Sequence, residues 1–360
     1  MESEGGLIVA ALPVPQHSLV QSIYGLHERR EASQEARPYL GASTLGEPCD
    51  RRLWLSFRWA DREQFDGRML RLFDTGHREE ARVLDELRAL GLEVWDRQAD
   101  GRQFRVSACG GHFAGHLDAV VQGLPEAPRT PHLVDVKTVN SKKFAELLKK
   151  GFRETYPRYW AQGQVYCGLM DLTRAAFIFV VKDTDQIHVE RFDFDPVDFA
   201  RLLARAERII FAAEPPLKLS NDAAFFGCKF CPFHSHCHGD SAPAPTCRSC
   251  AHVTPQRQGD ARWTCEHHSR DLSVSEQRTG CDFHRVIPIL LANWAEPIDS
   301  IDGAVLYRNK INGNQFLNGP RPEGYSSDEI HACADKGALG EPELKAFRDE
   351  FEGRIVEMAK

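Results

Sequence analysis

Long hydrophobic runs are absent from this sequence of 360 residues. No segment approaches the roughly 18 apolar residues that a membrane-spanning helix needs, so we expect no membrane partner. The apolar stretch 7–15 follows acidic residues and contains two prolines, which does not match a secretion signal. We therefore expect the protein to act in the cytoplasm.

A net positive charge is also absent. The formal net charge is −7, and contents of 42% hydrophobic and 27% charged residues are ordinary for a globular protein. Bulk electrostatics give no sign of nucleic-acid binding, although a metal-binding enzyme can concentrate carboxylates and keep a local basic groove. One local cluster of basic residues is either such a groove or a solvated helix face: Lys142, Lys143, Lys149, Lys150, Arg153 and Arg158.

The sequence contains eleven cysteines, although it has no recognisable export signal. In a reducing cytoplasm cysteines seldom form a disulfide framework and more often ligate metals. We therefore expect metal-binding groups among them.

Alternating strand-like and helix-like segments predict an α/β core. The expected helices span 42–60, 76–90, 142–152, 156–170 and 195–213, and the expected strands span 92–96, 102–106, 112–123, 132–138, 174–182 and 186–194. Gly91 is the expected stop of the second helix, and Asp195 with Pro196 the expected start of the last.

A Pro/Ala-rich linker at 241–246 marks the expected end of the core. We divide the chain into a flexible lead-in at 1–35, a core domain at 36–240, a cysteine-rich metal-binding module at 241–300 and an accessory element at 301–360. In the accessory element we expect two strands around an Asn-Gly turn, followed by a capped helix that begins near Ser326.

Two carboxylates and a lysine lie in apolar strand-like segments. Asp118 ends the sequence GHLD, and Asp135 and Lys137 lie in HLVDVKT. Residues i and i+2 of a strand share a face, so Asp135 and Lys137 project together. Burying these charges is costly unless something compensates for them, and a divalent metal would do so. Oxygen ligands favour magnesium or manganese, and Glu80, or the adjacent Glu79, is a further candidate ligand from the preceding helix.

Gln162 and Tyr166 lie four residues apart on an expected helix, so they share a face that can point into the same site. Each piece alone has an ordinary alternative: a chance D-x-K, a hairpin aspartate, or an amphipathic helix surface. The order of the whole set favours function, because G-x3-E, G-H-x-D, D-x-K-T and Q-x3-Y follow one another along the chain.

With these motifs, residues 40–240 resemble the RecB-like branch of the PD-(D/E)XK nuclease superfamily. The resemblance implies a restriction-endonuclease-like α/β core, with a central mixed sheet flanked by helices, and metal-dependent cleavage of DNA phosphodiesters. It implies catalytic roles for the acids, Lys137, Gln162 and Tyr166, and it makes His116 an additional metal ligand. Val134 stands where the family usually has proline.

The same resemblance suggests an exonuclease that acts in DNA recombination, repair or phage DNA metabolism, in a bacterial or phage-infected cell. Its partners would be single- or double-stranded DNA ends and a helicase or recombination protein. Two alternatives stay open: a catalytically silent DNA-binding or assembly factor on the same fold, and a zinc-stabilised interaction protein.

A first cysteine group combines one cysteine before the core with three after it: Cys49, Cys228, Cys231 and Cys237. This split resembles iron–sulfur nucleases of the RecB-like and CRISPR-associated exonuclease type, which implies a 4Fe-4S cluster that links the two ends of the core. The alternative is local zinc, held by the three later cysteines and one nearby histidine: His234, His236 or His238.

A second group has C-x2-C-x14-C-x15-C spacing and suits a structural zinc ion or a second iron–sulfur site: Cys247, Cys250, Cys265 and Cys281. His267, His268 and His284 are substitute ligands, each with a surface histidine as the alternative. The three cysteines outside both groups are expected to be small apolar residues: Cys109, Cys167 and Cys333.

Overall fold

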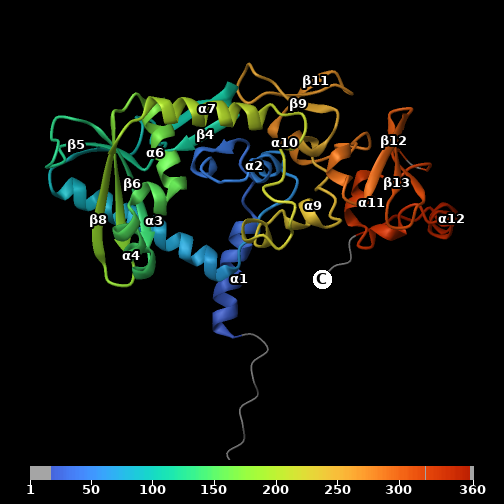
Figure 1. The fold of residues 1–360 in the computed structure, drawn as a ribbon, viewed down its shortest axis with the longest axis horizontal. Helices are drawn as coiled ribbons and strands as arrows, with labels where there is room; N and C mark the ends of the chain where they lie inside the picture. The colour runs from blue at the N-terminus through green and yellow to red at the C-terminus, as the bar shows by residue number, and fades with distance from the viewer. Residues whose placement is uncertain (1–17, 321, 357–360) are drawn as a thin grey trace, which may run out of the picture.

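The structure, a computed structural model, describes residues 18–320 and 322–356. The molecule is elongated, with a five-stranded sheet at one end and the elements after residue 295 at the other (Figure 1). Among the described residues, no helix is both long enough and apolar enough to cross a membrane.

The central sheet has the order β2-β5-β6-β7-β8. β6 runs parallel to β7, and every other neighbouring pair is antiparallel. The expected mixed sheet is therefore confirmed. Its strands are β2 Glu93–Trp95, β5 Ala119–Gln122, β6 His132–Val139, β7 Arg174–Val181 and β8 Gln186–Asp193.

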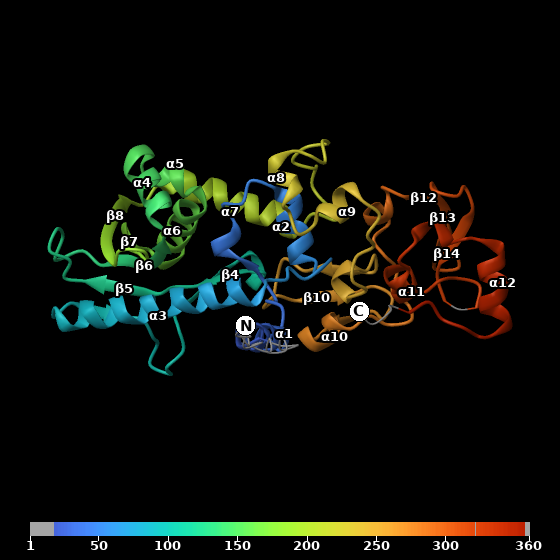
Figure 2. The same ribbon diagram turned by 90° about the horizontal axis from the view of Figure 1, so that it is seen from below.

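Helices cover both faces of this sheet (Figure 2). On one face, α3 (Gly67–Ala89) packs Val83 and Leu84 against Val134 and Val136 of β6. On the other face, α6 (Pro157–Met170) packs against β6 and β7, with α5 (Phe152–Thr155) against α6 and α4 (Ser141–Lys150) against α5. α7 (Pro196–Ile210) packs against α6. Because side chains alternate along a strand, Asp135 and Lys137 belong to the face covered by α6.

A second, three-stranded sheet has the order β1-β4-β3. Its strands are β1 Leu40–Gly41, β3 Arg105–Ala108 and β4 Phe113–His116. The single strand expected over 112–123 is wrong, because Leu117 and Asp118 separate β4 from β5 and the two strands join different sheets. Asp118 therefore lies at a break between strands.

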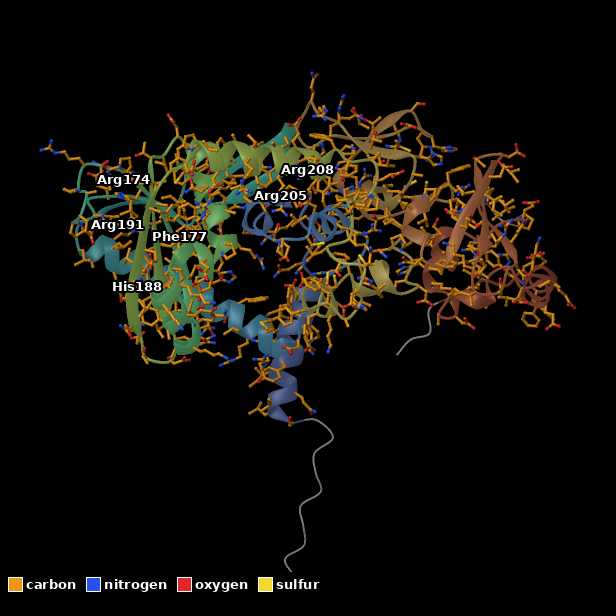
Figure 3. All side chains as sticks on the ribbon, in the orientation of Figure 1. Arg174, Phe177, His188, Arg191, Arg205 and Arg208 are labelled. Carbon is orange, nitrogen blue, oxygen red and sulfur yellow. The ribbon has the colours of Figure 1, made fainter. Side chains whose placement is uncertain are left out.

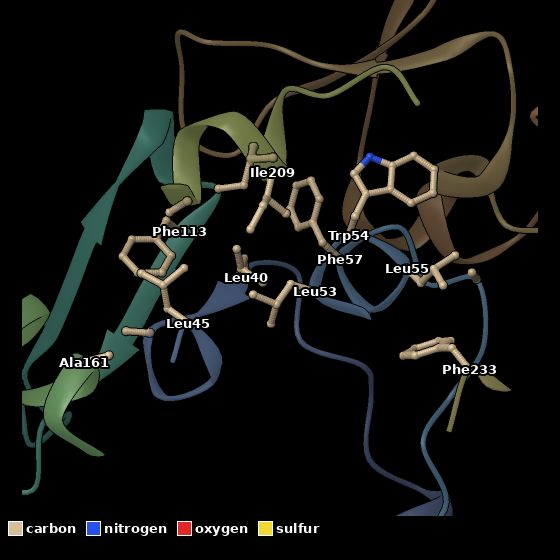
Figure 4. Close-up of a cluster of buried hydrophobic side chains, with 14 of the residues drawn as sticks. Leu40, Leu45, Leu53, Trp54, Leu55, Phe57, Phe113, Ala161, Ile209 and Phe233 are labelled. Carbon is tan, nitrogen blue, oxygen red and sulfur yellow. The ribbon is translucent and has the colours of Figure 1, made fainter. Parts of the chain in front are cut away.

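Helix α2 (Asp50–Phe57) lies at the centre of the main hydrophobic core. Its apolar residues at helical spacing are buried, and they lie near Phe113 of β4 and Ile209 of α7 (Figure 4). Cys49 is the N-cap of this helix, and its sulfur accepts a hydrogen bond from the backbone N–H of Arg52. The helix expected near 42–60 is thus confirmed, although it is shorter.

The N-terminal part contains more helix than expected. Residues 19–32 of the expected flexible lead-in form helix α1 (Leu19–Ala32), which begins with a capping box between Ser18 and Gln21 and packs against α3. Residues 1–17 lie outside the described residues. Helix α3 begins at Gly67 rather than near 76, because Asp66 accepts a hydrogen bond from Met69 N–H as its N-cap.

The chain after α7 forms short elements: α8 Phe226–Lys229, α9 His234–His238, β9 Val253–Pro255, β10 Trp263–Cys265, β11 Arg270–Leu272 and α10 Val274–Arg278. The expected linker at 241–246 packs against the core, since Ala244 N–H donates to the Ala60 carbonyl. Short 3-10 segments of three or four residues complete the fold: η1 Ala42–Thr44, η2 Cys109–Gly111, η3 Cys247–Ser249, η4 Pro288–Leu291 and η5 Lys336–Ala338.

The accessory element contains a sheet and two helices: β12 Ala295–Ile301, β13 Ala304–Asn309, β14 Gln315–Asn318, α11 Ser327–Ala332 and α12 Pro342–Glu350. The predicted hairpin is confirmed, with Gly313 at φ 79° in the turn between β13 and β14. The predicted helix cap is also confirmed, because Ser326 and Glu329 form a capping box.

Candidate active site and cysteine groups

Asp135 lies at the centre of the candidate active site and is fully buried on β6. Its Oδ2 accepts a hydrogen bond of 2.9 Å from Nε2 of Gln162. Its Oδ1 forms an ion pair with Nζ of Lys137. The prediction that Asp135 and Lys137 project together is thereby confirmed.

Asp118 approaches the same strand from the break between β4 and β5. Its Oδ2 accepts a hydrogen bond of 2.9 Å from the backbone N–H of Val136. Glu80, from α3, lies within electrostatic reach of Asp118 and Lys137. Glu79 instead forms an ion pair with Arg82, so the structure places Glu80 rather than Glu79 at the site.

The carboxylates influence one another strongly. Burial raises the pKa of Glu80 to about 7, and the charge on Asp118 adds to this shift. Burial also raises the pKa of Asp135, a shift that Lys137 opposes and Asp118 increases. Although burial disfavours the ammonium ion, Asp135 and Asp118 raise the pKa of Lys137. Three carboxylates thus share one lysine, a donor set with the excess negative charge that a hard divalent cation would neutralise.

Helix α6 brings Gln162 and Tyr166 to the same side, as predicted. Tyr166 is buried, and its pKa is raised by that burial and by the nearby Asp135. Gly115 of β4 allows this approach, because a Cβ at residue 115 would lie 2.6 Å from the Tyr166 hydroxyl oxygen. The glycine of the GHLD motif therefore makes room for the tyrosine of the Q-x3-Y motif.

His116 is exposed, and its Nδ1 lies 3.4 Å from the Tyr39 hydroxyl. Arg105, its register partner on β3, lies over the Tyr39 ring. The pKa of His116 is lowered by partial burial and by Arg105 and Arg37, so the imidazole is neutral at physiological pH.

Sequence reasoning missed Tyr39 and Tyr159. Nζ of Lys137 lies 4.9 Å from the centroid of the Tyr159 ring. Tyr159 precedes Gln162 by three residues, so the helical spacing that identified Gln162 and Tyr166 would have found it. Tyr39 belongs to no motif and carries no such signal.

The basic residues that follow β6 are largely paired. Lys143 and Lys150 both form ion pairs with Glu146, and Arg153 forms one with Asp198. Arg158 lies 3.6 Å from a carboxylate oxygen of Glu47. These contacts favour an ion-paired helix surface over a free basic groove.

The first cysteine group lines one cavity although its members are far apart in the sequence: Cys49, Cys228, Cys231 and Cys237. Helices α2, α8 and α9, which carry or adjoin these cysteines, lie near one another in Figure 2. His234 and His238 also line the cavity, whereas His236 lies 3.2 Å from Asp61.

Arginines of α7 hold the first residue of α2 in place beside Cys49. Arg205 and Arg208, labelled in Figure 3, donate hydrogen bonds of 2.7 and 3.0 Å to the carboxylate of Asp50. The position of Cys49 therefore depends on the packing of α7 as well as on α2 itself.

The second cysteine group also lines one cavity, of about 180 Å³: Cys247, Cys250, Cys265 and Cys281. The first three are buried and Cys281 is exposed. Each of the eleven cysteines, all within the described residues, is free of a disulfide. In the described part of the chain, no group of three or more His, Cys, Asp or Glu side chains is arranged to hold a metal ion as it stands.

Comparison with known proteins finds only distant likeness. Neither a family profile nor a curated protein sequence matches the chain. Among solved structures, SSO0001 is 16% identical over 61% of this chain and 95% of its own, with a TM-score of 0.36.

Two exonuclease structures are similarly distant. LHK-Exo, an alkaline exonuclease from Laribacter hongkongensis solved with dAMP, is 15% identical over 52% of this chain and 90% of its own, with a TM-score of 0.36. A phage related exonuclease from Haemophilus somnus 129PT is 13% identical over 48% of this chain and 92% of its own, with a TM-score of 0.34. At this distance we carry no function over from these proteins.

Proposed function

We propose that this protein is a magnesium- or manganese-dependent deoxyribonuclease that hydrolyses phosphodiester bonds at DNA ends. The observation that carries the proposal is the meeting of Glu80, Asp118 and Asp135 with a single lysine on and around β6. Burying such a charged group on an apolar strand is costly and does not help the strand to pack, so a function of the group accounts for it. Exonuclease action in recombination, repair or phage DNA metabolism, beside a helicase or recombination protein, is part of the proposal.

Each residue of the proposed active site has a separate role. Glu80, Asp118 and Asp135 would hold the cation, and His116 would add its second ring nitrogen, since Nδ1 faces Tyr39. A bound divalent ion orients and acidifies the attacking water and neutralises charge on the phosphate. Lys137 places a positive charge where negative charge develops during the reaction. Gln162 fixes the orientation of Asp135, and Tyr166 excludes water behind it.

The first cysteine group is proposed to hold a 4Fe-4S cluster. The support is that Cys49 lies at the same cavity as the three later cysteines, which gives four sulfur donors from both ends of the core. Zinc is the alternative, and one observation favours it. His238 lines the same cavity, and its Nε2 is buried without a hydrogen-bond partner.

One preparation tests both proposals. The full chain, purified without oxygen, is incubated with end-labelled linear single- and double-stranded DNA and magnesium or manganese. We expect cleavage that Asp135→Ala abolishes and that Asp85→Ala, a change at an exposed aspartate of α3, leaves intact. Cleavage that survives Asp135→Ala would overturn the active-site assignment. No cleavage by the wild type would favour the silent DNA-binding factor.

Iron, sulfide and zinc contents of the same preparation identify the metal. A broad visible absorbance lost in Cys49→Ser supports the cluster. Two zinc ions per chain retained in Cys49→Ser, without iron, would replace the cluster by the local Cys/His site, because the second cysteine group is itself expected to hold zinc.

A further inference from the structure

We propose that Cys247, Cys250, Cys265 and Cys281 bind one zinc ion, and that this ion holds the turn at Arg248 against the nuclease core. This site lies outside the proposed catalytic machinery, so neither proposal depends on the other. Each of the four thiols would release its proton to solvent on binding, which leaves a tetrathiolate site.

The four cysteines come from separate short elements around one cavity. Cys247 begins η3 and Cys250 follows its end, Cys265 ends β10, and Cys281 follows α10. The strands of this region are only three residues long, although Val253, Trp263 and Leu272 are buried in the main core. A metal ion bound by all four cysteines would cross-link these short elements.

The turn between Cys247 and Cys250 brings two of the four thiols to one cavity. Cys250 N–H donates to the Cys247 carbonyl, which closes the turn and places both side chains at the same cavity. The backbone N–H of Arg285 points at the Cys250 sulfur over 3.5 Å, and such a donor stabilises a thiolate. The Cys247 thiol donates to the Glu276 and Thr279 carbonyls, contacts that it would give up when it loses its proton and turns inward.

Histidines line the same cavity, but their contacts make them weaker candidates than Cys281. His267 stacks on Phe283 with the ring centroids 4.2 Å apart. Nε2 of His268 lies 3.7 Å from the Cys281 sulfur, as an outer partner of a ligand would. Nε2 of His284 lies 2.8 Å from the Thr246 carbonyl oxygen, which holds the ring in place. Nδ1 of His284 is buried without a hydrogen-bond partner, so His284 is the alternative fourth ligand.

The exposure of Cys281 favours zinc over iron–sulfur. An exposed cluster is open to oxidants, whereas zinc has no redox chemistry and tolerates solvent. A closed site with four sulfur donors is the usual environment of structural zinc.

Arg248, between two of the ligands, joins this turn to the core. Its guanidinium lies 3.7 Å from the centroid of the Trp59 ring and 4.6 Å from that of Trp263. It donates hydrogen bonds to the carbonyls of Phe57 and Pro38, at 3.1 and 2.9 Å. The side chain is fully buried, so it cannot leave this position without breaking the packing around it.

Arg58 makes the reverse connection from the core to the same turn. It donates hydrogen bonds of 3.2 Å to the Arg248 carbonyl and 3.0 Å to the Val253 carbonyl. Each arginine thus donates hydrogen bonds across the boundary between core and module. An ion bound by Cys247 and Cys250 fixes the backbone on both sides of Arg248 and thereby holds these hydrogen bonds in place.

Metal analysis of the full chain and cobalt substitution test the ligand set. We expect zinc in the purified protein, and after replacement by cobalt the visible absorption of a tetrahedral thiolate site. Cys281→Ser should weaken zinc affinity roughly 100-fold. His284→Asn and Cys333→Ser, a change at a buried cysteine outside both groups, should not alter it. Cys237→Ser separates the first group from the second, because it should leave this cobalt spectrum unchanged.

Hydrogen–deuterium exchange tests the proposed link to the core. Zinc removal should speed exchange of the amides over 56–60 and 248–253 and leave those of β7 protected. The proposal is overturned if affinity survives Cys281→Ser, if iron and sulfide occupy these cysteines, or if zinc removal changes exchange only within 261–281. If zinc affinity is instead lost in His284→Asn, His284 replaces Cys281 as the fourth ligand.

Discussion

Nε2 of Gln162 lies 2.9 Å from Oδ2 of Asp135, and this hydrogen bond joins helix α6 to the centre of the sheet. Both side chains are buried, so no water can replace the bond if either partner is lost. The orientation of the central carboxylate therefore depends on a residue that need not contact the substrate.

Gln162→Ala should lower kcat about tenfold, because an unrestrained Asp135 costs about 1.4 kcal/mol of transition-state stabilisation. Steady-state kinetics on labelled DNA measure this. Gln164→Ala is the matched control, because Gln164 hydrogen-bonds the backbone of Asp193 and Asp195 rather than the carboxylate of Asp135. It should lower the free energy of unfolding by about 1–3 kcal/mol and leave kcat unchanged. Equal kcat values for Gln162→Ala and the wild type would contradict the positioning role.

Glu80→Gln should stabilise the magnesium-free protein at alkaline pH. The pKa of Glu80 in the folded state, about 7, lies above its ordinary value of 4.5. The folded state therefore holds this proton more tightly, and stability falls as pH rises from about 4.5 to 7. Removing the charge should restore about 1 kcal/mol at pH 8, with allowance for solvent screening, and almost nothing at pH 4.5.

Urea unfolding of dialysed protein at both pH values checks this prediction. Added magnesium should stabilise the wild type at pH 8 more than it stabilises Glu80→Gln. The placement of Glu80 would be contradicted if the free energy of unfolding of Glu80→Gln rises equally at both pH values. It would also be contradicted if magnesium stabilises the variant as much as the wild type.

Gly115→Ala should destabilise the fold by about 1–3 kcal/mol, because the added methyl group would overlap the Tyr166 ring. Gly76→Ala is the matched control on α3, where the new Cβ would meet only Thr138 Oγ1 at 3.9 Å. It should stabilise the helix by up to about 1 kcal/mol. Thermal unfolding compares the two variants, and combining Gly115→Ala with Tyr166→Leu should recover part of the loss. Similar melting temperatures for both alanine variants would disprove this packing.

His116→Ala should raise the magnesium concentration for half-maximal cleavage about tenfold and leave the fold intact, because the histidine is exposed. Tyr39→Phe, which removes only the hydroxyl beside Nδ1, should have a smaller effect. Magnesium titrations of cleavage measure both. An unchanged half-saturation in His116→Ala would remove the histidine from the ligand set.

Sequence reasoning predicted the parts of the fold that depend on local patterns. The register of Asp135 and Lys137 follows from strand alternation, and the capping box at Ser326 follows from spacing alone. The strand break at Asp118 did not follow, because residues 113–122 are uniformly compatible with an extended chain, and only pairing with different neighbours separates β4 from β5.

The candidate site shows the same division. The order of the motifs along the chain predicts that Glu80, Asp118 and Gln162 belong to one site. Tyr39 was missed, because it reaches His116 through the pairing of β1 with β4, a tertiary contact without a sequence period. Helix α1 was also missed: its residues are largely exposed, so it lacks the apolar stripe by which helices are recognised.

The cavity shared by Cys49 and Cys237 has a consequence for the order of events during synthesis. A ribosome that adds 5–20 residues per second needs roughly 10–40 s to pass from the first of these thiols to the last. The three carboxylates, Lys137, Gln162 and Tyr166 of the candidate active site are all made within that interval. A nascent chain thus carries these groups before Cys237 is made, and a truncation between residues 167 and 236 would leave them on a core whose two ends are not yet joined.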